Sequence, residues 1–266
     1  MSRPGAPAVT APAMARPGRR AWEVDALRGV AIIMMVIYHL MWDLSAFDIA
    51  PVDLYGLFWQ SFQRATASLF LLLVGVSLQL RALRLGAAGA DRAALWRRQF
   101  RRGLAVFGCG LLVTAATLVA IPRGFVVFGI LHLIGVSIIL AYPFMALGRW
   151  NLPIGLAVIA AGNAVAGYVI DMPWLVWLGL RFPGFTSVDY FPLLPWFGVV
   201  LIGLAAGELA YGSGRRLPLP DLARLPPVRL LGWLGRHSLA IYLLHQPLLI
   251  AALIALGLLP LQRLGG

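Results

Sequence analysis

Seven long apolar segments constrain the fold of this chain more than any other feature. Each is about 20 residues long, the length that a helix needs to cross a hydrocarbon core ~30 Å thick. Lipid offers no hydrogen-bond partners, so a single spanning segment satisfies its backbone internally by forming a helix. The segments cover residues 26–44, 55–80, 101–120, 124–147, 152–170, 190–211 and 234–259. The sequence therefore predicts an all-α, polytopic transmembrane helical bundle of about seven spans.

The composition agrees with a membrane protein. Of the 266 residues, 61% are hydrophobic and 12% are charged, whereas a soluble domain is nearer half apolar and a quarter charged. The formal net charge of +12 could indicate nucleic-acid binding, but the arginines lie beside the apolar segments. In that position arginine anchors loops to the cytoplasmic face. We therefore predict the lipid bilayer as a partner and no nucleic acid.

The distribution of arginine sets the predicted orientation. All 22 basic residues are arginine, and seventeen of them fall in one set of loops and tails. The opposite set holds only Arg123, Arg181 and Arg263. Because positively charged loops stay in the cytoplasm, we predict that the N-terminus lies inside and the C-terminus outside. In a bacterial cell this describes a multi-pass protein of the inner membrane.

The predicted domain organisation is simple. Residues 1–20 are rich in Ala, Pro and Arg and lack an apolar stretch, so we expect a disordered cytoplasmic tail and no cleaved signal peptide. Residues 21–260 form the transmembrane domain, and residues 261–266 form a short extracytoplasmic tail. The stretch 172–185 is apolar but short and broken by proline, so we predict an interfacial or re-entrant segment there.

The first apolar segment carries ionisable residues, which are costly in a bilayer and therefore mark candidate functional sites. Arg28 opens it on the cytoplasmic side, and His39 lies eleven residues further on, which is roughly 16 Å along a helix. Asp43 follows at i+4, so it shares a helical face with His39. An aspartate beside a histidine fixes its tautomer and raises its basicity, which suits a general base. The structural alternative is that Arg28 snorkels and His39 hydrogen-bonds a neighbouring helix.

Three other helices carry polar residues at a similar depth. Arg64 lies about nine residues into the second span, His132 about eight into the fourth, and His245 about eleven into the last. Together with His39 they predict a shared polar cavity near the membrane midplane. Each residue alone is more typical of an interhelical hydrogen bond.

Two further patterns suggest residues that contact a substrate. Ser238, Tyr242 and His245 follow one another at i, i+4 and i+7, so they form one stripe along the last helix. Trp196 belongs to the segment YFPLLPWFG, residues 190–198, at the outer end of the sixth span. There it either lines the mouth of a substrate site or anchors the helix at the interface.

Four blocks of sequence resemble the bacterial relatives of the heparan-α-glucosaminide N-acetyltransferase catalytic domain. They read VDALRGVAIIMMVIYHLMWDL, FGILHLIGVSIIL, YFPLLPWFGVVLIG and GRHSLAIYLLHQP. The resemblance extends from about residue 22 to about residue 250. The Arg-x10-His spacing of Arg28 and His39, and the Ser-x3-Tyr-x2-His spacing of the last helix, are also similar to the wider superfamily of membrane acyltransferases.

The resemblance implies a glycan-modifying acyltransferase that works across the membrane. Acetyl-CoA would enter from the cytoplasm as co-substrate, without a metal, and a sugar hydroxyl or amine would enter from outside. His39 would be catalytic, and Arg28 would hold the phosphates of the donor, to which arginine is well suited. Asp43 would orient His39, while Arg64 or His132 would stabilise the oxyanion of the thioester. An acetyl-histidine intermediate, direct transfer and a homodimeric assembly are all compatible with these residues.

Two other functions fit part of the pattern. A proton-coupled transporter of small molecules could use His39 and Asp43 as a relay, but the sequence contains no pair of internal repeats. A haem- or quinone-binding redox protein could use intramembrane histidines as ligands. No two histidines, however, have the same-helix spacing of a stacked two-haem bundle.

Overall fold

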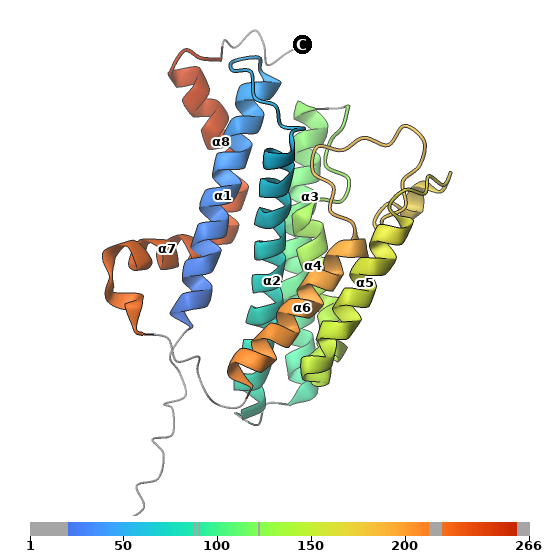
Figure 1. The fold of residues 1–266 in the computed structure, drawn as a ribbon, viewed down its shortest axis with the longest axis vertical. Helices are drawn as coiled ribbons and strands as arrows, with labels where there is room; N and C mark the ends of the chain where they lie inside the picture. The colour runs from blue at the N-terminus through green and yellow to red at the C-terminus, as the bar shows by residue number, and fades with distance from the viewer. Residues whose placement is uncertain (1–20, 88, 90, 122, 213–219, 260–266) are drawn as a thin grey trace, which may run out of the picture.

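The computed structural model describes residues 21–87, 89, 91–121, 123–212 and 220–259, and in this part of the chain the only regular elements are helices (Figure 1). The predicted tails, 1–20 and 261–266, lie outside the described residues. The α-helices are α1 (Trp22–Ala46), α2 (Leu57–Ala87), α3 (Arg92–Ala120), α4 (Ile130–Phe144), α5 (Asn151–Val165), α6 (Leu193–Tyr211), α7 (Pro226–Arg236) and α8 (Ser238–Ala255). Three short 3-10 helices join them: η1 (Met145–Trp150), η2 (Pro173–Leu175) and η3 (Leu222–Arg224).

Six helical segments of the described chain are long and apolar enough to cross a membrane. One of them, Ile130–Val165, is interrupted at Gly148, whose φ of 52° and ψ of −122° are not helical. The chain turns back there, and α4 and α5 become two separate 15-residue helices. Counted in this way, the described residues agree with the prediction of about seven spans.

Helices α2 and α3 extend well beyond the apolar segments that predicted them. The polar stretch 81–100 continues both helices almost to Asp91, whose side chain accepts hydrogen bonds from the backbone N–H groups of Ala93 and Ala94. Asp91 is therefore the N-cap of α3. Alanine, leucine and arginine have high helix propensity, so these segments stay helical outside the apolar core.

The helices form two groups that meet along α1 and α2 (Figure 1). Helices α2 to α6 make a five-helix bundle. Helices α7 and α8 pack on α1, with α7 lying across it. Glycines permit the close approach of α1 and α7, because a side chain at Gly29 would collide with the backbone of Leu231, and one at Gly235 with the backbone of Asp25.

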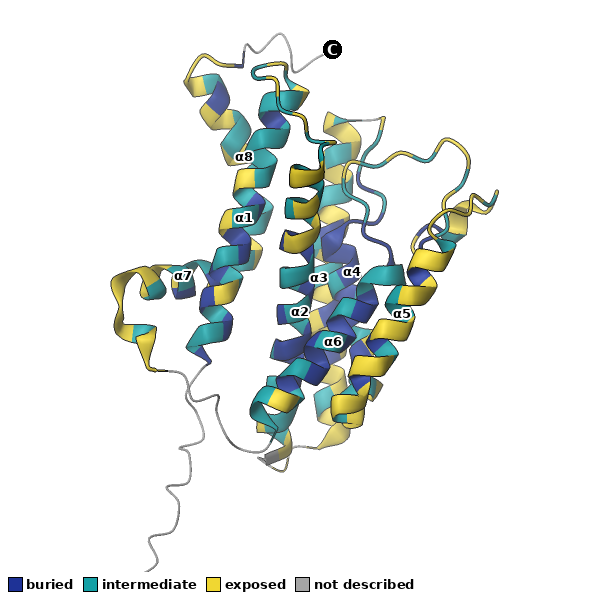
Figure 2. Cartoon of the chain, in the orientation of Figure 1, coloured by how far each residue is buried: buried dark blue, intermediate teal, exposed yellow. Residues whose placement is uncertain are grey.

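The buried core lies inside the five-helix bundle, between α2, α4 and α6 (Figure 2). Leu71, Leu133, Leu201 and Leu204 are fully or almost fully buried there. The outward faces of α3 and α5 remain exposed although they are apolar, which is the pattern of surfaces that contact lipid tails. The bundle thus buries one face of each helix and leaves the other to the membrane.

The connections gather at two opposite ends of the bundle (Figure 1). Residues 47–56, 123–129 and 166–192 lie at one end, and the α4–α5 turn lies at the other with the start of α1 and the end of α6. This grouping agrees with the two sets of loops defined by arginine. The segment 172–185 contains only η2 and a single bridge between Val169 and Arg181, and it does not form a spanning helix.

Candidate functional site

His39 on α1 meets His245 on α8. Their ring centroids are 4.6 Å apart, and the ring planes are inclined at 82°. His245 is buried and His39 is half-buried. The structure therefore brings together two of the four polar residues that were expected near the midplane.

Both imidazoles are held in the same tautomer. Nδ1 of His39 lies 2.9 Å from the carbonyl oxygen of Met35, and Nδ1 of His245 lies 2.6 Å from that of Tyr242. A carbonyl oxygen only accepts, so Nδ1 carries the proton in each ring and Nε2 of each neutral ring offers a lone pair. Nε2 of His245 is buried and has no hydrogen-bond partner among the described residues.

Asp43 hydrogen-bonds to α8 and makes no hydrogen bond to His39 in the described part of the chain. It is completely buried, and its Oδ1 accepts a short hydrogen bond from Nε2 of Gln246. Asp43 and His39 share a helical face, but the tautomer of His39 is set by the carbonyl of Met35. The orienting role expected for Asp43 therefore falls to a backbone group.

The α1–α8 interface contains three buried acceptor atoms without partners in the described residues: Nε2 of His245, Oδ2 of Asp43 and Oε1 of Gln246. An unsatisfied buried acceptor costs about 1–3 kcal/mol, and native proteins contain few of them. Three on one interface mark a place suited to a molecule that brings hydrogen-bond donors.

Arg28 lies nearer the opposite end of α1. Its Nη2 donates to Oγ of Ser77 on α2 at 2.6 Å, and its Nη1 pairs with Asp25 at 3.2 Å. The positive charges of Arg28 and Arg81 act on the guanidinium of Arg102, so α1, α2 and α3 each contribute an arginine to this part of the bundle. Like charges converge at little cost only where anions or solvent screen them.

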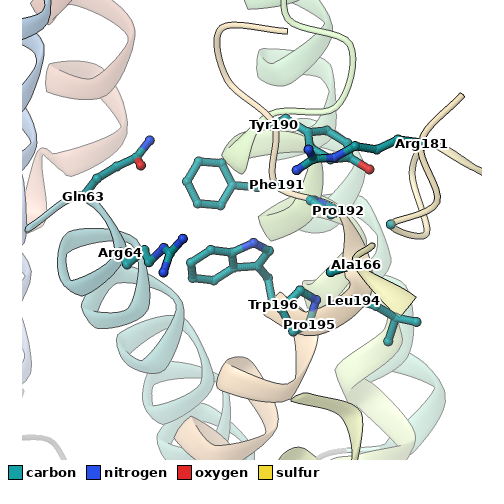
Figure 3. Close-up of a pocket in the computed structure, with 11 residues that line it drawn as sticks. Gln63, Arg64, Ala166, Arg181, Tyr190, Phe191, Pro192, Leu194, Pro195 and Trp196 are labelled. Atoms are coloured by element: carbon teal, nitrogen blue, oxygen red, sulfur yellow. The ribbon is translucent and has the colours of Figure 1, made fainter. Parts of the chain in front are cut away.

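Arg64 and Trp196 line a cavity at the loop end of the bundle. The cavity holds about 240 Å³, and Figure 3 shows the guanidinium of Arg64 on α2 beside the indole of Trp196 on α6. The lining residues are Gln63, Arg64, Ala166, Gly179, Arg181, Tyr190, Phe191, Pro192, Leu194, Pro195 and Trp196. The Trp196 ring packs 5.0 Å from that of Phe191. Arg64 thus belongs to a site with Trp196 and makes no described contact with His39.

His132 is held inside the bundle by neighbours of its own. It is 2% exposed, its Nδ1 accepts from the backbone N–H of Gly129, and its Nε2 lies 3.4 Å from Oγ1 of Thr114. Its ring packs against Phe107 and Phe128. Both ring nitrogens are occupied at the start of α4, and this arrangement favours a structural role.

The stripe on α8 divides after its first member. Ser238 starts α8 and makes no side-chain hydrogen bond among the described residues. Tyr242 is one turn further on, and its hydroxyl donates to Oδ2 of Asp189 at 3.4 Å. The same oxygen accepts from the backbone N–H of Ile130 at 3.2 Å. Burial raises the pKa of the Asp189 carboxyl to about 6, and these two hydrogen bonds oppose the rise.

Sequence reasoning missed Gln246 and Asp189. Gln246 directly follows His245 in the block GRHSLAIYLLHQP, and its amide was a polar group in a spanning helix. Asp189 directly precedes the segment YFPLLPWFG, at the outer end of the sixth predicted span. In both cases the sequence offers one indication of a functional role, which is the position next to a residue or segment already identified as a candidate.

The fold and these buried polar residues define a polytopic α-helical membrane protein with a site between its first and last helices. Residues 20–247 match the family described as heparan-alpha-glucosaminide N-acetyltransferase, catalytic. The chain belongs to this family, and the resemblance identified in the sequence is confirmed. Membership makes it a membrane acetyltransferase of a family whose acetyl donor is acetyl-CoA. No curated protein and no solved structure matches the chain.

Proposed function

We propose that this protein transfers the acetyl group of cytoplasmic acetyl-CoA to a sugar hydroxyl or amine on the extracytoplasmic side of a bacterial inner membrane. The observation that carries the proposal is the His39–His245 contact, in which the Nδ1–H groups are bound to carbonyls and Nε2 is free to act. The chain that carries this contact belongs to a family of acetyltransferases.

In this mechanism His39 is the catalytic base. Its Nε2 takes the proton from the acceptor as the acceptor oxygen or nitrogen attacks the thioester carbonyl carbon. The carbon–sulfur bond then breaks, and the CoA thiolate takes up the proton. The same lone pair is the nucleophile if an acetyl-histidine forms first. Either route requires the lone pair of Nε2, and the hydrogen bond to Met35 places the proton of the neutral ring on Nδ1.

We propose that the buried oxygen atoms without hydrogen-bond partners beside the histidines bind the substrate that receives the acetyl group. Oδ2 of Asp43 and Oε1 of Gln246 are buried and have no partner in the described chain. A hydroxyl or amine brings the hydrogens that these atoms lack. Binding the acceptor there offsets the cost of leaving them unsatisfied.

The donor is assigned to the opposite end, where Arg28, Arg81 and Arg102 converge. The pyrophosphate and 3′-phosphate of CoA are polyanionic, and arginine binds phosphate oxygens through charge and paired N–H donors. Arg28 lies on the same helix as His39, eleven residues earlier, roughly 16 Å along the axis. The pantetheine arm of CoA is long enough to cover that distance.

The cavity of Arg64 and Trp196 is assigned to the outer part of the acceptor. Aromatic rings stack on the faces of sugars, and Gln63 and Arg64 supply hydrogen-bond donors beside them. At about 240 Å³, the cavity is smaller than a usual ligand site of roughly 300–1,000 Å³. It suits one sugar ring rather than an extended chain.

The geometry supports this function over haem binding. A haem iron held by two histidines lies between their rings, whereas the rings of His39 and His245 contact each other directly at 4.6 Å. A transporter is not supported either, because the sequence contains no pair of internal repeats.

The decisive experiment measures acetyl-CoA binding and slow hydrolysis by the detergent-purified protein, with water as the acceptor. His39→Ala should bind acetyl-CoA but not hydrolyse it, and Arg28→Ala should bind it weakly. Asp171→Ala, in an exposed loop at the end of the bundle away from Arg28, is the control and should behave like wild type. A folded wild-type protein that neither binds nor hydrolyses acetyl-CoA would overturn the proposal.

A further inference from the structure

Helix α8 carries His245. Among the described residues, a single hydrogen bond joins α8 to the part of the chain that runs from α2 to α6. It is the bond from the Tyr242 hydroxyl to Oδ2 of Asp189. The other described side-chain hydrogen bonds of α8 run to α1, through Gln246, or stay within α8. The position of α8 relative to the five-helix bundle therefore depends on Asp189 more than on any other polar group.

Asp189 is itself held in place by two loop segments that hydrogen-bond to each other. Val188 donates its N–H to the carbonyl of Gly124 at 2.8 Å, and Phe191 donates to Phe128 at 2.9 Å. The Ser187 hydroxyl donates to the carbonyl of Phe125 at 3.0 Å. Segments 124–130 and 187–191 thus run side by side and fix the backbone on both sides of Asp189.

The carboxylate of Asp189 also fits the start of α4 closely. Its Oδ2 accepts from the N–H of Ile130, which is one of the unpaired amide groups at a helix N-terminus. The carboxylate packs against Gly129 so closely that a side chain at that position would collide with it. The position of the carboxylate that Tyr242 contacts is therefore well defined.

Tyr242 connects this carboxylate to the histidine pair. Its ring centroid lies 5.5 Å from that of His245, and its carbonyl oxygen accepts the Nδ1–H of His245. Tyr242 thus contacts His245 through its ring and through its backbone. A shift of Tyr242 changes both the place and the orientation of the His245 imidazole.

We propose that Asp189 is a positioning residue, which holds Tyr242 and thereby keeps His245 in contact with His39. The inference rests on the proposed function in one respect, since it concerns the site assigned to acetyl transfer. The described side-chain hydrogen bonds of Asp189 run to Tyr242 and to the backbone of Ile130. Asp189 acts from the loop end of the bundle through Tyr242, and its loss lets Tyr242, and with it the His245 imidazole, shift relative to the bundle.

The size of the effect follows from the geometry of catalysis. A misplacement of about 1 Å can cost on the order of 100-fold in rate, whereas binding of a distant part of the substrate is little affected. Asp189 and the arginines assigned to the donor lie at opposite ends of the bundle. Loss of Asp189 should therefore lower kcat about 10-fold or more and leave the KM for acetyl-CoA unchanged.

The test compares Asp189→Ala, Tyr242→Phe and the double variant with Asp189→Asn and the control Asp171→Ala, using acetyl-CoA hydrolysis. Both single variants should lose kcat to a similar extent, and the double variant should lose no more, because each variant removes the same hydrogen bond between Tyr242 and Asp189. Asp189→Asn keeps an accepting oxygen and should recover most of the rate. Losses that multiply in the double variant, or a rise in KM alone, contradict the inference.

A second readout does not depend on activity. Diethyl pyrocarbonate modifies exposed imidazole nitrogens, and the modified histidine is located by mass spectrometry. Modification of His245 should be several-fold faster in Asp189→Ala and Tyr242→Phe than in wild type, Asp189→Asn or Asp171→Ala. Equal rates in all five proteins overturn the positioning role.

The two readouts separate failure of this inference from failure of the proposed function. If His39→Ala is inactive while Asp189→Ala matches Asp171→Ala in kcat and in modification of His245, the transferase stands and the positioning role is wrong. If wild type does not hydrolyse acetyl-CoA, the function fails, and the modification rates alone decide whether Asp189 holds α8 in place.

Discussion

The carboxylate of Asp43 accepts its hydrogen bond from Gln246 on α8 and not from His39 on its own helix. Together with the His39–His245 contact, this gives the α1–α8 interface two polar cross-links on one face of α1. Neither link is an ion pair. The two helices are therefore linked by polar contacts that involve no cationic partner. Between them lie buried hydrogen-bond acceptor atoms that have no partner in the described residues.

His39→Gln should abolish hydrolysis of acetyl-CoA while the protein remains folded. Glutamine keeps the volume and polarity of the site but has no basic lone pair at the position of Nε2. General-base catalysis contributes about 10²–10⁴-fold, so the residual rate should fall at least ~100-fold. Stopped assays with labelled acetyl-CoA measure it, with elution in size-exclusion chromatography as the check on folding. A variant that retains wild-type turnover removes His39 from the mechanism.

Gln246→Met should destabilise the protein, because it leaves the buried carboxylate of Asp43 without its described partner. The loss of a hydrogen bond to a buried polar group costs about 1–3 kcal/mol, so the melting temperature in detergent should fall by several degrees. The double variant Asp43→Leu with Gln246→Met removes both partners and should recover stability without recovering activity. If the double variant is less stable than either single variant, the pair is not the cause of the change.

Arg28→Ala should weaken acetyl-CoA binding about 10-fold or more, the value of one charged hydrogen-bond contact. The same side chain also links α1 to α2 through Ser77, so the matched control is Ser77→Ala, which removes the link and keeps the charge. Isothermal titration with acetyl-CoA and with desulfo-CoA measures the change. Equal weakening by Ser77→Ala would assign the effect of Arg28 to helix packing.

Asp189→Asn should change how stability depends on pH. The pKa of Asp189 is raised from 3.8 to about 6 in the folded protein, so ionisation is costlier there than in the unfolded chain. The contribution of Asp189 to the free energy of unfolding is greatest below the pKa that this carboxyl has in the unfolded chain. It falls as the pH rises from about 4 to 6. The fall should be about 1–2 kcal/mol, less than the full shift implies, because the residue stays partly exposed.

Melting temperatures of wild type and Asp189→Asn between pH 4 and 7.5 measure this difference. The wild-type value should decline relative to that of the variant as the pH increases, and the two curves should run parallel above pH 7. Parallel curves over the whole range would show that Asp189 ionises at an ordinary pKa.

The spans could be predicted because hydropathy reports directly on burial in lipid. The segment 26–44 became α1 (Trp22–Ala46), and 190–211 became α6 (Leu193–Tyr211). Hydropathy could not predict that α3 begins at Arg92, since that end is helical by propensity and by its cap at Asp91. The predicted span 234–259 also included the end of α7 (Pro226–Arg236), because a short amphipathic helix has no long apolar run of its own.

The sequence predicted how deep in the membrane each candidate side chain lies, but not toward which neighbouring helix it points. Counting residues along a helix gives the height of His39 and His245, and these two do meet. The rotation of each helix about its axis depends on packing, which a single sequence does not specify. For that reason His132 was grouped with them although it caps its own helix, and Arg64 was grouped with them although it lies beside Trp196.

Asp43 and Gln246 are 203 residues apart in the sequence, and the histidine pair joins the same first and last spans. At a synthesis rate of about 5–20 residues per second, α1 enters the membrane roughly 10–40 s before its partner is made. Until then the nascent chain has neither cross-link and no complete site. The interface between the first and last helices therefore forms only after the last helix has been made.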